Sequence, residues 1–547
     1  MRLRKQWLGL LGLALFSLWP TDDVTAADWM GVAGGVPVPA ALGVLTIGQD
    51  IEAGIATSDW IVIVAYALGM IGVGWYCSRR ATTTEDYMLG GRAMKPWAVG
   101  LSLFATLFST LTYLAIPGEM IMHGPMIAAQ IVIFPLIILV VGWVLIPRIM
   151  KFKVTSAYEI LETRLGIGVR MLGVSFFLGM RLLWMSLIIY VTTSQVLVLL
   201  LGWDESATPY ICAVLGIVTV IYTSMGGLRA VVITDVVQTF ILLGGAALTI
   251  LLITVDLGGV GAWWPTQWDP AWDPPKIWFD TDARMTVAMA SLFAFTWYVC
   301  TAGADQMAIQ RFLATRDVKA ARSMYSTSLF INALVMVFLS ILGLALFAWF
   351  QANPNMLVEG QTIATSADNL LLRFIVIGLP NGVSGLIVAA LLAAAMSSLS
   401  SGINSSCLVI TVDFVERFRA ADRPQTDHVR LAKYISWLLG IVVVGLSFGV
   451  GMVPGNLLEV TYKLLTLPVA PLFVLFYMAM FVPWSTPFGT IVAATVSMAV
   501  AIGIGFFELM GLGFIWIIPV SLIVGIVVGM LASLVPVGQT TRGRPNG

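Results

Sequence analysis

Long apolar runs recur along the chain from about residue 59 to the C-terminal region, with short polar stretches between them. Each run has close to 20 residues, which an α-helix needs to cross the roughly 30 Å hydrocarbon core of a bilayer. The pattern predicts an all-α polytopic membrane protein with about 13 transmembrane helices. The predicted spans are 59–77, 96–118, 126–147, 171–201, 209–225, 230–254, 285–304, 327–350, 379–409, 432–451, 457–481, 487–507 and 513–536.

The N-terminus has a different pattern. A basic stretch, MRLRK, is followed by the short apolar run WLGLLGLALFSLW and by the small residues of VTAA. This order is typical of a secretory signal peptide, and it predicts cleavage after Ala26. The alternative is a short first membrane helix, and both interpretations place residues 28–58 outside the cell.

Basic residues fall in alternate loops, and this pattern predicts the orientation. Four loops carry the clusters Arg79, Arg80, Arg92 and Lys95; Arg148, Lys151, Lys153, Arg164 and Arg170; Arg311, Arg316, Lys319 and Arg322; and Arg417, Arg419, Arg423, Arg430 and Lys433. Lys and Arg are enriched in cytoplasmic loops. We therefore predict a multi-pass protein of the plasma (inner) membrane, with its N-terminus extracytoplasmic and its C-terminal tail cytoplasmic.

The second to sixth and the seventh to eleventh predicted spans make two sets of five. Two odd-numbered sets in series have opposite orientations in the membrane, as in the inverted-topology repeats of many secondary transporters. The predicted divisions are a signal peptide (1–26), an extracytoplasmic segment (27–58), the first transmembrane helix with a cytoplasmic loop (59–95), the first five-helix repeat (96–255), an extracytoplasmic Trp-rich loop (256–284), the second five-helix repeat (285–481), two peripheral transmembrane helices (482–536) and a cytoplasmic tail (537–547).

Composition supports the membrane assignment and excludes several functions. The chain is 59% hydrophobic and only 11% charged, whereas about a quarter of the residues in a soluble domain are charged. Its 29 basic and 29 acidic side chains balance, so no bulk attraction to nucleic acid is implied. Four cysteines without a CxxC pair, two histidines and the lack of a P-loop or nucleophile motif suggest neither enzyme activity nor a bound cofactor.

A serine-rich stretch, AAAMSSLSSGINSS, lies within the predicted ninth span. Ala394, Ser397, Ser398 and Ser401 have the spacing i, i+3, i+4 and i+7, so they share one face of a helix, and Ser400 lies beside them. Such hydroxyl oxygens could bind a small cation. The alternative is close helix packing through small residues, which spacing alone favours.

Two charged residues fall within other apolar spans. The motif GGLRAVVITDVVQ opens the sixth predicted span and carries Asp235 about two turns into it, where an unpaired carboxylate is costly and functional by default. Arg181 lies about ten residues into its span, close to the membrane midplane. For Arg181, substrate binding and a structural ion pair within the bundle are equally supported.

Five motifs occur in an order that resembles the sodium/solute symporter family. They are EDYMLGGRAMKPWAVGLSL, SAYEILETRLG, GGLRAVVITDVVQ, DQMAIQRFLA and AAAMSSLSSGINSS. The resemblance covers nearly the whole chain after about residue 55. The family includes carriers of sugars, proline, sialic acid, iodide, vitamins and monocarboxylates, and the resemblance implies a LeuT-type fold with a five-plus-five inverted repeat and flanking helices, and Na⁺ as the coupling ion.

The family's sodium site implies ligands in two stretches of this sequence. Matching residue by residue, the primary site would use the carbonyls of Ala105, Phe108 and Ala394 and the hydroxyls of Ser397 and Ser398. Broken helices often contain Gly or Pro, yet the matching stretch FATLFST has neither.

Some members of the family have a second sodium site. Its matching positions here are Asp235, Ser397, Ser400 and Ser401, and every ligand type is present.

The substrate is less well indicated. Family sugar carriers have polar side chains at positions that match Leu107, Leu111 and Thr112. The stretch TLFSTLTYLAIPGE more closely resembles carriers of monocarboxylates, vitamins and sialic acid, all anions. Ser109 and Thr112 keep the hydroxyls that sialic acid carriers use, and Gln130 in the next span is a weaker candidate beside Arg181.

These observations predict a sodium-coupled secondary active symporter that imports a small organic solute by alternating access. The expected solute is an anion, monocarboxylate-like or sialic-acid-like. The expected partners are that solute, sodium and membrane lipids, without nucleic acid. The alternatives are a sodium/sugar or polyol symporter, a solute-sensing membrane protein and an ion channel.

Overall fold

The computed structural model describes residues 55–79, 83–280, 283–417, 425–450, 465–507 and 509–535. These residues are almost entirely helical, and none of them lies in a β-strand. The predicted signal peptide (1–26), nearly all of the extracytoplasmic segment and the tail (537–547) lie outside the described residues, so their assignments stay predictions.

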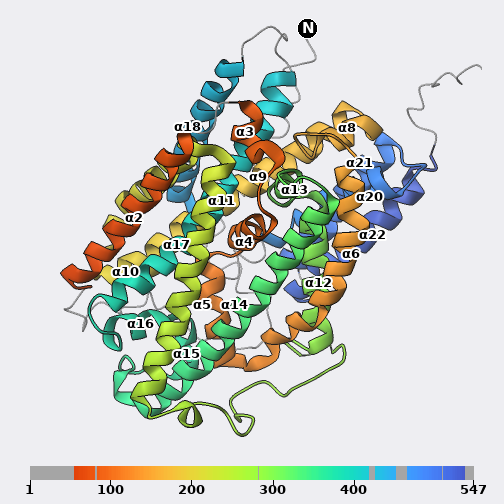
Figure 1. Cartoon of the computed structure of the whole chain (residues 1–547). Coiled ribbons are helices and arrows are strands. Elements are labelled where there is room, and N and C mark those ends of the chain that lie inside the picture. The colour runs from red at the N-terminus through yellow and green to blue at the C-terminus, as the bar shows by residue number, and fades with distance from the viewer. Residues whose placement is uncertain are drawn as a thin grey trace, which may run out of the picture. The chain divides into compact units, whose positions relative to one another are not determined.

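Ten helices of the described chain are long and apolar enough to cross a membrane, or eleven if one bent pair is counted as a single span. The ten are Thr57–Ser78 (α2), Pro125–Met150 (η3 to α7), Ile167–Leu201 (α9 to α10), Glu205–Asp256 (η6 and α11), Val287–Ala304 (α12), Val318–Ala352 (α14), Val383–Glu416 (α17 and η10), Val429–Val450 (in α18), Pro487–Phe507 (α21) and Phe514–Ala532 (η12 and α22) (Figure 1). Shorter helices are α3 (Thr84–Leu89), α8 (Glu159–Leu165), α13 (Gln306–Leu313), α15 (Ile363–Ser366), α16 (Leu370–Ile377) and α20 (Val469–Phe481).

The difference from 13 predicted spans has a structural reason. The helix α11, Thr208–Asp256, has 49 residues and contains Gly227 with the non-helical angles φ 57° and ψ −152°. At 1.5 Å per residue it measures about 74 Å, more than twice the bilayer core. Gly227 lies between the predicted spans 209–225 and 230–254, so α11 has the length of two spans. The helix α20 is the described part of the predicted span 457–481.

The bent pair is α4 (Pro96–Leu107) and α5 (Thr110–His123), which meet at an angle of 70°. Phe108 and Ser109 between them are extended, with φ −105° and −117°. Any L-amino acid adopts these angles, so the break requires neither glycine nor proline. The broken helix implied by the resemblance is therefore present despite the lack of such residues in FATLFST.

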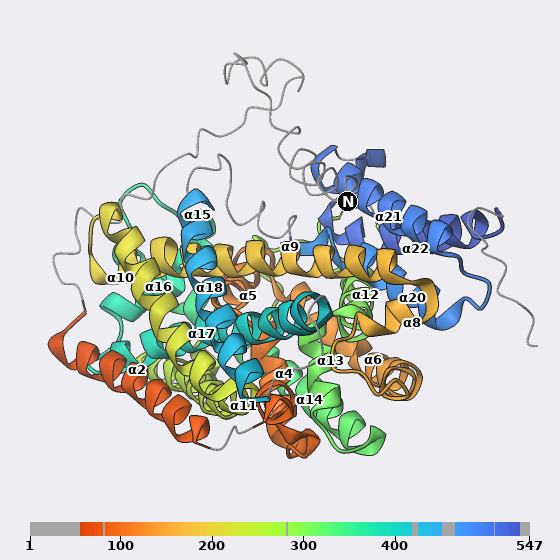
Figure 2. The ribbon, with the colours of Figure 1, turned by 90° about the horizontal axis from the view of Figure 1, so that it is seen from above.

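The serine-bearing helix α17 (Val383–Val409) is the most enclosed of the ten candidate spans. In its apolar window 94% of the residues are buried, against 22% in the peripheral α2. Helix α17 packs against α4, α9, α11 and α18, and the view from above shows it within the bundle (Figure 2). A helix that is buried on all sides belongs to the core, so its hydroxyls meet protein atoms rather than lipid.

Gly227 provides a test of the break in α11. Its backbone angles are essentially restricted to glycine, and an added Cβ would lie 2.3 Å from the carbonyl oxygen of Tyr87. We expect Gly227→Ala to lower the free energy of unfolding by about 2 kcal/mol or more, seen as a lower unfolding temperature in detergent. The control is Gly244→Ala in the same helix, where a Cβ meets no atom within 4 Å. Equal stability of the two variants would contradict the role of Gly227.

Candidate functional site

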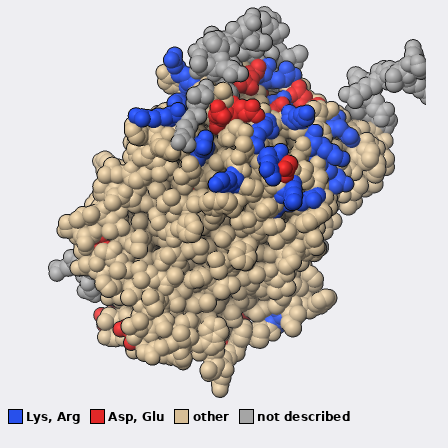
Figure 3. Space-filling view, viewed as in Figure 1, with Lys and Arg blue, Asp and Glu red and all other residues tan. Residues whose placement is uncertain are grey.

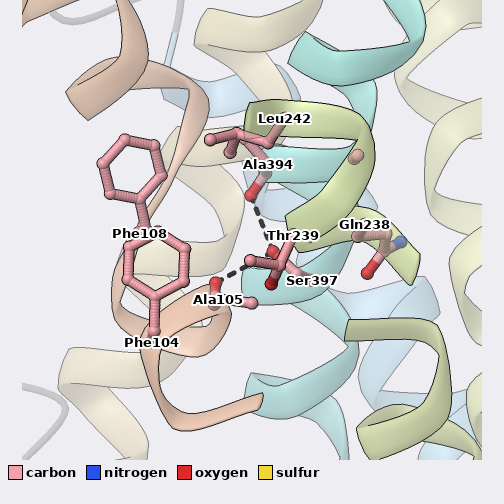
Figure 4. A pocket seen from close by; sticks show the side chains of 9 residues that line it. Phe104, Ala105, Phe108, Gln238, Thr239, Leu242, Ala394 and Ser397 are labelled. Atoms are coloured by element: carbon pink, nitrogen blue, oxygen red, sulfur yellow. Dashed lines mark hydrogen bonds between the residues drawn. The ribbon is translucent and has the colours of Figure 1, made fainter. Parts of the chain in front are cut away.

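The serines of α17 hold the break between α4 and α5. Ser397 Oγ donates to the carbonyl oxygens of Ala105 (2.9 Å) and Ala394 (3.1 Å) (Figure 4). Ser398 Oγ donates to Phe108 O (3.1 Å) and also reaches a second carbonyl of α4. The last carbonyl groups of a helix have no hydrogen-bond donors within the helix. At the end of α4 the serine hydroxyls of α17 are these donors. The structure thus brings together all five residues of the predicted primary sodium site.

This cluster has the chemistry of a cation site. The C-terminal end of α4 carries the negative end of the helix dipole, and unwound carbonyls of broken helices coordinate Na⁺ in secondary transporters. Each serine oxygen also keeps lone pairs after its proton is donated. Three carbonyl and two hydroxyl oxygens therefore fit a small cation that prefers oxygen ligands.

A narrow cavity adjoins the cluster and extends to α11. It is too narrow to admit a water molecule, and its walls are mostly apolar. Thr239 in this wall lies one turn from Asp235, to whose backbone carbonyl its hydroxyl donates at 2.8 Å. The lining residues are Phe104, Ala105, Phe108, Gln238, Thr239, Leu242, Ala393, Ala394 and Ser397 (Figure 4).

Asp235 is fully buried on α11. Its Oδ2 accepts a hydrogen bond from Ser102 (2.5 Å) and forms an ion pair with Arg311 (3.3 Å), whereas its Oδ1 has no hydrogen-bond partner among the described residues. The Ser401 hydroxyl accepts from the same Arg311 nitrogen at 2.7 Å. Ser400 donates to a carbonyl of its own helix instead. Of the predicted second sodium set, Asp235 and Ser401 are thus joined through a guanidinium group.

Arg311 is a residue whose role the sequence analysis missed. It was placed in a cytoplasmic basic cluster, but the structure buries its side chain completely. Arg170, assigned to another such cluster, is also buried and pairs with Asp413. The prediction that these two arginines lie in loops is wrong, because Arg311 lies in α13 and Arg170 in α9. The available signal was Asp235 itself, because a carboxylate within an apolar bundle requires a cation nearby.

The substrate candidates are only partly brought together. The hydroxyls of Ser109 and Thr112 lie 3.5 Å apart at the start of α5. Gln130 is half-buried in η3 (Pro125–Ile133). Among the described residues no hydrogen bond joins Gln130 or Arg181 to the two hydroxyls. The first turn of α5 nevertheless packs on α9, the helix of Arg181, through Leu111.

Arg181 forms a buried ion pair with Asp305. An ion pair within the bundle was one of the two alternatives that the sequence left open for this residue. Its guanidinium also lies 4.6 Å from the ring centroid of Trp184, and its Nε has no hydrogen-bond partner. Asp305 caps the N-terminus of α13, accepting from the Met307 N–H at 2.9 Å. One donor of Arg181 therefore stays free for another acceptor.

Comparison with known proteins now identifies the family. The family model described as "Sodium:solute symporter family" matches residues 87–497. The chain belongs to this family. A sodium/sialic acid symporter of Proteus mirabilis is 31% identical over 70% of this chain and 76% of its own length. One from Aliivibrio fischeri is 28% identical, over 78% of this chain and 83% of its own length.

A solved structure gives the same result for the fold. The substrate-bound, outward-open state of a Na⁺-coupled sialic acid symporter superimposes with a TM-score of 0.77 at 26% identity, covering 88% of this chain and 98% of the other. The LeuT-type fold implied by the sequence is confirmed, as is membership of a family of sodium-coupled symporters. The matched residues include every candidate site residue.

Ser398 allows a test of the primary cluster. We expect Ser398→Ala to raise the sodium concentration for half-maximal thermal stabilisation roughly tenfold, the effect of losing about 1.4 kcal/mol of binding energy. The matched control is Ser406→Ala on the same helix, because the buried Ser406 hydroxyl has no hydrogen-bond partner. A sodium titration of both purified variants measures the difference. An unchanged value in Ser398→Ala would remove this residue from the site.

Proposed function

We propose that this symporter imports a small organic anion together with two sodium ions. The observation that carries the anion assignment is the buried guanidinium of Arg181, with one free donor, on the helix that packs against the broken α4–α5 pair. An arginine fork binds carboxylates through paired hydrogen bonds. The relatives from Proteus mirabilis and Aliivibrio fischeri are sodium/sialic acid symporters, and a sialic-acid-like or monocarboxylate-like solute is consistent with this chemistry.

The side chains around the break in α4–α5 disfavour a sugar. Leu107 and Leu111 are apolar, and Leu111 packs against Leu187 and Val191 of α9. A sugar requires several hydrogen-bonding groups, because polar groups buried without partners are costly. Ser109 and Thr112 supply two hydroxyls next to these leucines, and we assign them to the solute together with Arg181.

The distribution of charge supports the proposed orientation. Lys and Arg side chains gather at one end of the molecule, near α3 and α8, whereas the rest of the visible face carries few charges (Figure 3). Enrichment of Lys and Arg marks the cytoplasmic side. We therefore assign this end to the cytoplasm and the opposite end to the outside.

Ion pairs lie towards both ends of the bundle, where the two gates of an alternating-access carrier have to open in turn. At the cytoplasmic end Glu162 pairs with Arg170 and Arg417. Burial raises the pKa of Glu162, but hydrogen bonds from these two arginines outweigh it and bring the pKa below its ordinary value. At the outer end Arg284 binds Glu119 of α5 through two hydrogen bonds of 2.9 Å. We assign these contacts to the gates that separate and reform during transport.

Energetics favour two sodium ions for an anion. A tenfold sodium gradient supplies about 1.4 kcal/mol per ion, and one sodium with one monovalent anion moves no net charge, so it supports about tenfold accumulation. A second sodium ion adds the free energy of its own concentration gradient, again about 1.4 kcal/mol. Its uncompensated charge adds about 2.3 kcal/mol per 100 mV of membrane potential. The total of about 5 kcal/mol supports accumulation of several thousandfold.

The solute and the stoichiometry can be measured together in proteoliposomes. We expect electrogenic, sodium-dependent uptake of an anion from a panel of labelled sialic acid, short monocarboxylates and glucose. The reversal potential should correspond to two sodium ions per solute. A ratio of one would remove the second site, and preferential uptake of glucose would replace the anion by the sugar alternative.

Arg181→Lys tests the anion site. Lysine keeps the charge but lacks the planar fork, so we expect the apparent affinity for the transported anion to fall roughly tenfold or more. Stabilisation by sodium alone should change less than about twofold, well under the tenfold that corresponds to 1.4 kcal/mol. The control is Arg148→Lys. Arg148 donates to the carbonyl of Val144 in its own helical segment and lies 4.6 Å from the ring centroid of Phe481, and within the described part of the chain it contacts no proposed site residue. Loss of thermal stability together with both affinities would mean that Arg181 is only a structural partner of Asp305.

A further inference from the structure

The fully buried Arg311 guanidinium lies among the oxygens proposed for the second sodium ion. One nitrogen, Nη2, contacts both Asp235 Oδ2 (3.3 Å) and Ser401 Oγ (2.7 Å). Two members of the proposed ligand set are therefore shared by a single protein cation. We propose that Arg311 is a tethered competitor of sodium, which occupies Asp235 and Ser401 until the second ion displaces it. This inference rests on the proposed second sodium site.

Repulsion between adjacent cations is the first argument. Asp235 and Arg311 balance each other, and both side chains are completely buried. A sodium ion bound beside the intact pair would lie next to the guanidinium, and two adjacent buried cations repel each other strongly. The ion and the guanidinium therefore compete for the one carboxylate.

The contact between Asp235 and Arg311 is incomplete, which is the second argument. A strong guanidinium–carboxylate pair has two parallel hydrogen bonds of about 2.7–2.9 Å. Here one oxygen of Asp235 is reached at 3.3 Å, and its other oxygen is buried without any partner. Buried polar atoms in proteins are nearly always satisfied. The carboxylate thus holds the guanidinium by a weak contact, and its free oxygen is a place where sodium can first bind before it displaces Arg311.

Arg311 has anchors that do not depend on the sodium ligands. Its Nη1 donates to the carbonyl of Met307 in the same helix α13 (2.9 Å), and its Nε donates to Ser102 (3.0 Å). Neither acceptor belongs to the proposed sodium set. Breaking the Nη2 contacts alone therefore frees Asp235 and Ser401, and the guanidinium need not leave the protein interior.

Removal of the competitor should tighten sodium binding. In Arg311→Gln the carboxylate of Asp235 loses its counter-charge, and sodium becomes the cation that can neutralise it. We expect lower thermal stability in sodium-free choline buffer, restoration by sodium, and a half-saturating sodium concentration at least about tenfold below that of the wild type. Binding of ²²Na⁺ and unfolding temperature in detergent are the two measurements.

Two controls separate this role from a structural one. Arg322→Gln removes another arginine, whose Nε donates to the carbonyl of Gly142 at 2.7 Å and which contacts none of the proposed sodium ligands among the described residues. It should lose stability that sodium does not restore. The double variant Asp235→Asn/Arg311→Gln removes both charges, so it should regain stability without sodium and bind one sodium ion fewer.

The outcomes are distinct. Arg311→Gln with an unchanged or weaker sodium affinity, or with a stability loss that sodium does not restore, would overturn the proposal and leave Arg311 as a structural partner of Asp235. If Arg311→Gln does not fold, Arg311→Lys replaces it: a shorter point charge makes fewer hydrogen bonds, and an unchanged sodium affinity would again overturn the proposal. Failure of the proposed second site appears differently, because the wild type would then bind a single sodium ion and the double variant would bind no fewer.

Discussion

The ion pair between Asp235 and Arg311 is the interaction on which the arrangement of the bundle interior depends. A carboxylate in an apolar helical bundle must have a cation beside it, and this one joins α11 to α13 across 76 residues of sequence. Ser102 of α4 binds both of these groups, and Ser401 of α17 accepts a hydrogen bond from the guanidinium of Arg311. One buried charge pair therefore fixes the relative positions of four helices, and these helices carry both proposed sodium sites.

The short helix α13 connects this pair to the proposed solute site. Asp305 at its N-terminus pairs with Arg181, and Arg311 near its end pairs with Asp235. The two ion pairs use one acid and one base of α13, so the four groups are neutral together. An added anion or an added sodium ion would each leave one net charge, whereas both together leave none. Electrostatics alone thus favours the joint binding of solute and ion.

The sequence predicted those features of the fold that depend on residues close together in the chain, such as the spans and the faces of the helices. Hydropathy located the spans, including the boundary between 225 and 230 where Gly227 breaks α11, and helical spacing placed Ser397, Ser398 and Ser401 on one face. The pairing of Arg311 with Asp235 is a contact between distant segments, which periodicity does not encode. Arg311 was assigned to a loop because a charge at the end of an apolar run usually lies in one. The carbonyl partners of the serines were accessible only through the family resemblance.

The serines on one face of α17 were interpreted either as helix-packing residues or as sodium ligands, and both interpretations concern the same oxygen atoms. Ser397 and Ser398 hold α17 against the broken helix by donating to Ala105 and Phe108, so the hydroxyls are packing contacts. A sodium ion at this position would bind the same hydroxyl and carbonyl oxygens, and it would replace these hydrogen bonds rather than fill a separate space. The ion then takes over the bonds that set the angle between α4 and α5. Sodium binding therefore changes the bonds that hold the break between α4 and α5. A coupling ion must affect the conformation of the carrier in this way.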